Sequence, residues 1–233
     1  MPYHGNSAVK MHITHKRVSA RRNIYMSKSK NTAKTLHLTQ LSVLVALLLV
    51  FGFTNIGYIK IGVIEITLNV IPVAIGAIVL GPSAGAVCGA VFGLTSFWQA
   101  MSGMSAFGAM LVNVSPVFTF ILCFVPRILE GYLTALIFKA LMKAFKSKNS
   151  VPCAVASLSC PLLNTLMFVG SFILLFGKTD VFAGLYSQSA ATNIVSFFAW
   201  FVGLNGVVEA IAGFIIATAV SKALLVANKR LIK

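Results

Sequence analysis

The feature that most constrains this chain is a succession of six long apolar stretches. Hydrophobic residues make up 58% of the 233 residues and charged residues only 10%, whereas charged residues are roughly a quarter of a typical soluble domain. Runs of about 18 or more apolar residues are typical of membrane-spanning helices. The sequence therefore predicts an all-α, polytopic membrane protein with a six-transmembrane-helix bundle. The expected segments are 37–54, 67–80, 84–101, 116–142, 151–176 and 195–226.

The connections between these segments carry their own signals. The second segment is too short to cross a hydrocarbon core of ~30 Å alone, so we expect neighbouring helices to enclose it. Residues 55–66, NIGYIKIGVIEI, partly alternate between apolar and polar, which predicts a short extended or hairpin-like cap. Gly81 and Pro82 predict a tight turn. Residues 102–108 and 177–193 are expected to be loops.

The net charge of +15 is gathered in three clusters rather than spread over a surface. Residues 1–39, 139–148 and 222–233 hold eight, four and four of the 19 Lys and Arg. Because Lys and Arg collect in cytoplasmic loops, six crossings with both termini in the cytoplasm place all three clusters on one side. The four charges expected on the opposite side sum to zero. This pattern favours membrane topology, with lipid around the chain, over nucleic-acid binding.

The sequence divides into a membrane part and two basic ends. We expect residues 1–36 to form a disordered cytoplasmic tail, 37–226 the membrane domain and 227–233 a second cytoplasmic tail. The first part has no apolar core of the kind found in secretory signal peptides; alternatively, translation begins at Met26. The four cysteines lie in apolar segments without a CxxC pair, which indicates buried free thiols. We expect no metal and no cofactor.

Charged and amide side chains lie inside the predicted helices. Arg127 is eleven residues into the fourth segment, a depth of about 17 Å at 1.5 Å per residue. Asn164 and Asn205 lie at a similar depth in the fifth and sixth segments, and Glu130 and Glu209 about one helical turn deeper. A charge in mid-membrane costs at least ~2.5–3.5 kcal/mol and usually faces a protein interior or a cavity. We therefore expect a polar chamber that opens to the outside and has acidic residues at its floor.

Two interpretations of these polar residues are open. In one, Glu130 or Glu209 neutralises Arg127 and the asparagines merely join helices. In the other, the guanidinium binds a carboxylate in a bidentate manner and the asparagines bind hydroxyls and amides. Buried ion pairs rarely stabilise more than apolar packing does, which favours a recognition site. The sequence has no GxxxxGK[ST] phosphate loop and no HExxH motif, and no histidine lies deep inside a segment where it could serve a nucleophile as a base. We therefore expect neither an ATPase nor any other enzyme.

Small residues recur at helical spacing in two segments. Gly85, Gly89 and Gly93 form a GxxxGxxxG stripe, which lets another helix backbone approach closely. Packing within the chain is the favoured interpretation of this stripe, and dimerisation is the alternative. Ser42 and Ala46 are also four residues apart in the first segment and predict a smaller contact surface.

The order of motifs resembles the substrate-binding S components of energy-coupling factor (ECF) vitamin transporters. After a first helix with small residues come ITLNVIPVAIGAIVLGPSAGAVCGAVFGLTSFWQA, VPRILEG, LLNTLMFVGSF and GLNGVVEAI. The resemblance covers about residues 37–226. It implies a six-helix bundle in the bacterial plasma membrane that binds a vitamin near its outer face, beneath the first extracellular loop. It also implies docking on a transmembrane coupling subunit driven by two cytoplasmic ATPases, with Ser42 and Ala46 in place of the family's AxxxA surface.

Among these S components, GYIKIG and IEITLNVIPV are most similar to the pantothenate-type members. Pantothenate carries a carboxylate, two hydroxyls and an amide, which suit an arginine and two asparagines. Riboflavin, which would stack on aromatic rings, and folate are alternative substrates. A self-sufficient transporter with Glu130 and Glu209 as a proton relay, and an assembly protein without a ligand, are alternatives of other classes. The expected substrate-binding residues are Arg127, Asn164, Asn205, Glu130, Glu209, Asn69, Tyr58 and Trp98.

Overall fold

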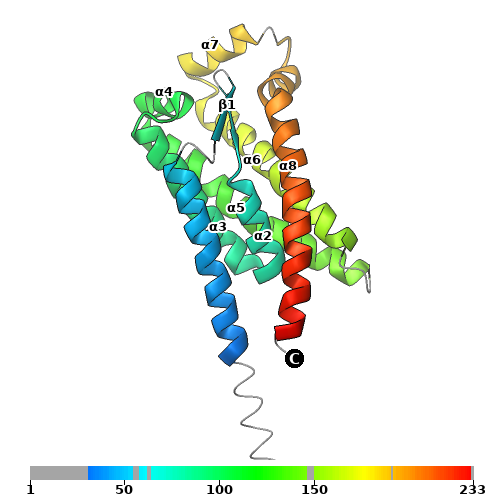
Figure 1. The fold of residues 1–233 in the computed structure, drawn as a ribbon. Coiled ribbons are helices and arrows are strands. Elements are labelled where there is room, and N and C mark those ends of the chain that lie inside the picture. The colour runs from blue at the N-terminus through cyan, green and yellow to red at the C-terminus, as the bar shows by residue number, and fades with distance from the viewer. Residues whose placement is uncertain (1–30, 55–57, 62–63, 146–149, 190, 232–233) are drawn as a thin grey trace, which may run out of the picture.

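The computed structural model of the chain describes residues 31–54, 58–61, 64–145, 150–189 and 191–231. This part is almost entirely helical (Figure 1), which confirms the predicted all-α class. The N-terminal helix begins at residue 31, before the expected segment, while most of the predicted tail and Met26 lie outside the described residues. The elements are the N-terminal helix Asn31–Phe53, β1 Tyr58–Ile61, β2 Ile64–Thr67, α2 Val70–Leu80, α3 Pro82–Met101, α4 Ala106–Val114, α5 Pro116–Ala144, α6 Ser150–Phe176, α7 Asp180–Gln188 and α8 Ile194–Leu231.

Five described helical stretches are long and apolar enough to cross a membrane. They are the N-terminal helix, α3, α5, α6 and residues 209–231 of α8. The remaining predicted segment is α2, whose 11 residues span only about 16 Å. Nine of those 11 residues are buried. The short second segment is therefore enclosed by its neighbours, as its length predicted.

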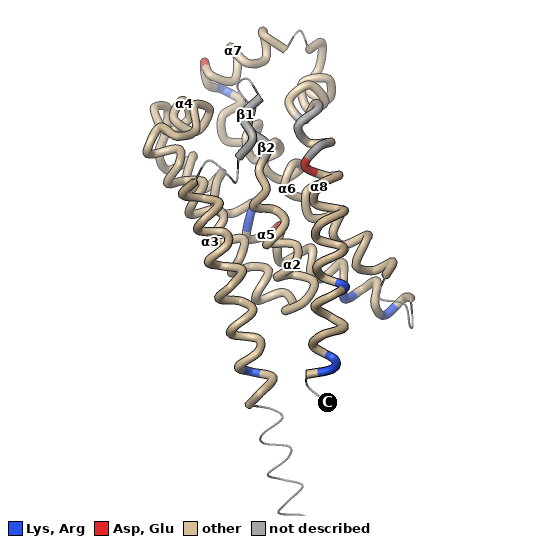
Figure 2. Tube along the Cα trace, in the orientation of Figure 1, with Lys and Arg blue, Asp and Glu red and all other residues tan. Residues whose placement is uncertain are grey.

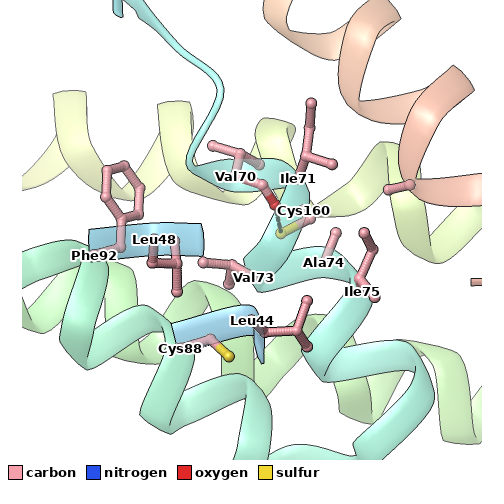
Figure 3. Close-up of a cluster of buried hydrophobic side chains, with 11 residues drawn as sticks. Leu44, Leu48, Val70, Ile71, Val73, Ala74, Ile75, Cys88, Phe92 and Cys160 are labelled. Carbon is pink, nitrogen blue, oxygen red and sulfur yellow. Dashed lines mark hydrogen bonds between the residues drawn. The ribbon is translucent and has the colours of Figure 1, made fainter. Parts of the chain in front are cut away.

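The core around α2 joins the N-terminal helix, α2, α3, α6 and α8 (Figure 3). Leu44 and Leu48 of the N-terminal helix pack with Val73 of α2 and with Phe92 of α3. Cys160 of α6 reaches the same cluster, and its thiol lies 3.8 Å from the carbonyl oxygen of Val70. Lipid tails are as apolar as these side chains, so close packing, not removal from water, holds such helices together.

The two ends of the bundle differ. The β1–β2 hairpin lies at the end opposite the described chain ends (Figure 1) and pairs Lys60 with Glu65 in antiparallel register, which confirms the hairpin-like cap. Lys and Arg positions of the N-terminal helix, α5 and α8 lie mostly toward the end that holds the chain ends (Figure 2). This separation agrees with the charge pattern from which the topology was predicted.

The glycine stripe of α3 packs against α5 within the same chain. A Cβ on Gly85 would collide with the backbone of Gly131, and a Cβ on Gly89 with the backbone carbonyl of Arg127. A Cβ on Gly93 would lie 2.7 Å from the carbonyl oxygen of Cys123. The two backbones touch because the stripe has no side chains, which confirms the intrachain interpretation.

The predicted turn between the second and third segments is also confirmed. Gly81 has φ 97°, a left-handed conformation that favours glycine, and α3 begins at Pro82. Proline suits this first helical position because its missing N–H would have no helical acceptor there.

The two expected loops, 102–108 and 177–193, were partly wrong. The first runs into the short helix α4, and the second contains the short helix α7. The Ser105 side chain caps α4 by accepting a hydrogen bond from the backbone N–H of Gly108, at 3.2 Å. Thr179 caps α7 in the same way by accepting from Phe182, at 3.3 Å. Such caps satisfy N–H groups that a helix start leaves free, so each polar residue begins a helix rather than extending a loop.

The sixth segment was expected to be continuous, and here the structure differs. Gly203 inside α8 has φ 35° and ψ −146°, which is not helical, so α8 consists of two helices joined at a break. The long apolar span within it begins only at Glu209. This break matters for the depth of the polar residues that follow it.

Candidate binding site

A cavity of about 150 Å³ lies among α3, α4, α5, α6 and α8. Its walls mix apolar side chains, several of them phenyl rings, with polar groups. Such a mixture is typical of sites for small molecules, where the polar groups fix orientation. The polar members are Thr67, Ser96, Gln99, Ser105, Thr119, Arg127, Asn164, Thr165 and Glu209.

Arg127 lines this cavity and is 8% exposed. Its guanidinium carbon lies 5.1 Å from the ring centre of Phe92 and 4.5 Å from that of Phe168. Cation–π attraction of this kind strengthens in a desolvated site. Nη1 donates a hydrogen bond to the Leu122 carbonyl oxygen at 2.9 Å, whereas Nε is buried and has no partner. The side chain is thus held on one edge and unpaired on the other.

The predicted alternative, in which Glu130 or Glu209 neutralises Arg127, is supported only as an electrostatic interaction without direct contact, because the charge of Arg127 acts on both carboxyl groups. Among the described residues, no ion pair joins either carboxylate to the guanidinium. An isolated buried charge is unfavourable unless a partner compensates it. The unpaired edge of Arg127 therefore has the chemistry of a receptor for an anionic group.

The opposite polar group of the cavity is formed by Asn164 and Glu209. Asn164 Nδ2 donates to Glu209 Oε1 at 3.2 Å and so joins α6 to α8. Asn164 Oδ1 is buried and has no partner. Glu209 was expected one turn deeper than Asn164, and the two side chains nevertheless meet. The prediction counted depth along a straight sixth helix, whereas α8 is broken at Gly203, between the start of α8 and Glu209.

Glu130 lies outside the cavity lining and is completely buried. Its Oε1 accepts a hydrogen bond from the Cys160 thiol at 3.1 Å, and its Oε2 is buried without a partner. Asn69 is also completely buried outside the lining, and neither polar atom of its side chain has a partner. These two predicted site residues do not join Arg127 in the lining of the cavity.

The other predicted residues are not brought to the cavity by described contacts. Trp98 is 56% exposed, packs edge-on against Phe53 with ring centres 6.2 Å apart, and does not line the cavity. The side chains of Tyr58 and Asn205 lie outside the described part of the structure.

The predicted contact surface on the N-terminal helix lies on its outside. Ser42 and Ala46 are both exposed, while Leu44 and Leu48 face the core. The Ser42 hydroxyl donates to the Leu38 carbonyl of its own helix at 2.9 Å. The hydroxyl thus bonds within its own helix, and both small residues remain on the surface.

Several cavity residues were missed although helical spacing could have found them. Phe168 follows Asn164 by four residues, and Thr119 precedes Cys123 and Arg127 at the same spacing. Residues four apart share a helix face, so the phenyl ring over the guanidinium lies on the predicted face. Gln99 had no such signal, since its Nε2 donates to the Gly52 carbonyl of the distant N-terminal helix, at 2.6 Å.

Comparison with known proteins identifies one matching family and two similar proteins. A family model described as the substrate-specific component of ECF transporters matches residues 36–221. The pantothenate transporter PanT of Leuconostoc mesenteroides subsp. mesenteroides is 29% identical over 205 residues, which are 84% of this chain and 95% of that protein. The pantothenic acid transporter PanT of Lactococcus lactis subsp. cremoris is 29% identical over 166 residues, 68% of this chain and 76% of that protein.

Proposed function

Because the chain belongs to the family of substrate-specific components of ECF transporters, we propose that it binds pantothenate in the cavity among α3, α4, α5, α6 and α8. The observation that carries this proposal is the unpaired edge of Arg127 in the cavity. The names of the two relatives support the choice of pantothenate among the vitamins.

The chemistry of pantothenate suits the polar groups of the cavity. Its carboxylate would bind the free edge of Arg127, because two parallel N–H donors match a carboxylate. Its hydroxyls and amide would bind Asn164 and Glu209, which together offer donors and acceptors on the other wall. Its methyl groups would pack on the phenyl rings of the lining. Asn205 stays a proposed member of this second group of residues.

We further propose that the chain works with partners. Substrate would enter from outside at the hairpin end, and both chain ends would lie in the cytoplasm of a bacterial cell. A transmembrane coupling subunit with two ATPases would drive delivery inward, since the sequence has no phosphate loop of its own. The exposed strip around Ser42 and Ala46 would be the docking surface for that subunit.

Ligand identification tests the substrate. The protein is purified from rich medium, any bound small molecule is identified by mass spectrometry, and the stripped protein is titrated with pantothenate, riboflavin and folate. Pantothenate is expected to bind saturably and with the highest affinity. Binding of riboflavin or folate in its place would overturn the choice of substrate, and binding of none would overturn the site.

Vesicle uptake tests the partners. Accumulation of labelled pantothenate is expected only when the coupling subunit and both ATPases are present and ATP is supplied. Uptake by this chain alone that stops when the proton gradient is collapsed would contradict the proposal. It would favour a proton-coupled transporter in which Glu130 and Glu209 exchange protons.

A further inference from the structure

Pro126 immediately precedes Arg127 in the middle of the 29-residue helix α5. In a regular helix the N–H of residue 126 would donate to the carbonyl oxygen of residue 122. Proline has no N–H, so the Leu122 carbonyl has no helical donor. In a membrane such a carbonyl must find another partner within the protein.

Arg127 supplies that partner. Its Nη1 donates to the Leu122 carbonyl oxygen at 2.9 Å. The residue that follows the proline thus bonds back to the acceptor that the proline released. An arginine next to a different residue would share this carbonyl with a backbone N–H.

This bond decides which edge of the guanidinium faces the ligand. With Nη1 committed to Leu122, the edge made by Nε and Nη2 is left, and in the described structure neither atom has a hydrogen-bond partner. Rings of Phe92 and Phe168 lie over the guanidinium and limit its tilt. Two N–H groups on one edge form the fork that binds a carboxylate.

We propose that Pro126 is a positioning residue for anion recognition, because the carbonyl it frees holds Arg127 with its carboxylate-binding edge toward the cavity. The identity of the ligand rests on the proposed function, whereas the orientation of Arg127 by the Leu122 carbonyl does not. A proline that only bent α5 would affect every ligand alike. A proline that acts through Arg127 affects ligands according to their charge.

The test compares pantothenate with its neutral alcohol analogue, in which CH₂OH replaces the carboxylate. Pro126→Ala restores an N–H for Leu122 and is expected to reduce the preference for pantothenate over the alcohol about tenfold, the value of one charge-assisted hydrogen bond. Affinity for the alcohol is expected to stay within about threefold. Pro161→Ala is the matched control, because Pro161 also lies inside a membrane helix but does not line the cavity. It is expected to leave the preference unchanged.

Equal losses for both ligands in Pro126→Ala, or an unchanged preference, would overturn the proposal. A measurement on the unliganded wild type keeps it testable if that variant does not fold. In protein labelled with ¹⁵N-arginine, the resonances of Arg127, assigned by their loss in Arg127→Lys, are expected to show separate Nη1 and Nη2 signals because rotation is hindered. One averaged signal would overturn the positioning role. If the wild type binds neither ligand, the proposed function fails, and the Nη signals still decide how Arg127 is held.

Discussion

The two polar walls of the cavity are built in different ways. Behind Arg127, the backbones of α3 and α5 touch along the glycine stripe, and Gly89 leaves no room for a methyl group. On the other wall, Asn164 and Glu209 join α6 to α8 through a side-chain hydrogen bond, and α8 is broken at Gly203. Backbone contact permits little adjustment, whereas a side-chain bond beside a helix break permits more. The cavity thus offers a fixed group for a charged end of the ligand and an adjustable group for the rest.

Removing the fixed charge is expected to have the largest effect. Arg127→Ala should weaken pantothenate binding at least about 30-fold, because losing a buried, hydrogen-bonded charge contact costs ~2–5 kcal/mol. Titration calorimetry on the protein in nanodiscs measures this effect. The melting temperature should also fall, because the variant leaves the buried Leu122 carbonyl without this donor and removes the contacts with Phe92 and Phe168. Unchanged affinity would show that the anion binds elsewhere.

Displacing the backbone behind Arg127 is expected to have the next largest effect. Gly89→Ala places a Cβ against the Arg127 carbonyl, and overpacking of this kind costs ~1–3 kcal/mol. Pantothenate affinity should fall roughly tenfold, with a lower melting temperature. Gly170→Ala is the control, because a Cβ on Gly170 of α6 would meet no other atom within 4 Å. Equal behaviour of the two variants would mean that the α3–α5 wall yields easily.

Most of the fold could be predicted because membrane helices leave strong signals. The apolar runs, the basic clusters and the Gly81–Pro82 turn each follow from local physics, and the structure agrees with them. The sequence did not predict the irregular features, which are the break inside α8 and the short helices α4 and α7 in the expected loops. Single glycines are common in membrane helices, so the sequence around Gly203 does not reveal that the helix breaks there.

Site residues could be predicted only where counting along a single helix is enough to give their depth and the helix face on which they lie. Arg127 and Asn164 were found because they are polar residues in the middle of regular helices. Glu130 shares a helix with Arg127, yet only Arg127 lines the cavity, while Glu130 accepts a hydrogen bond from Cys160. Trp98 has the right chemistry on the wrong face of α3. Which way a side chain turns depends on tertiary contacts that spacing does not contain.

Within the adjustable wall, loss of charge alone is expected to have a moderate effect. Glu209→Gln keeps the size and an acceptor for Asn164, so binding should weaken only about threefold to tenfold, the value of one ligand hydrogen bond. Glu130→Gln is the control, because Glu130 is a buried carboxyl outside the cavity. It should change the dissociation constant less than the Glu209 variant does. A larger effect at Glu130 would place the important carboxyl beneath the cavity and reverse the assignment.

The smallest effect is expected at the helix break itself. Gly203→Ala puts a side chain at φ 35°, a conformation that costs ~1–3 kcal/mol for residues other than glycine. Because a Cβ on Gly203 would meet no other atom within 4 Å, the strain can relax by local movement of α8. Pantothenate affinity should therefore change no more than about threefold, with a slightly lower melting temperature. Gly184→Ala in α7 is the control, since that glycine is also surrounded by open space. A loss as large as that of Arg127→Ala would show that the α8 wall is as rigid as the α3–α5 wall, and the division between a fixed and an adjustable side would then be wrong.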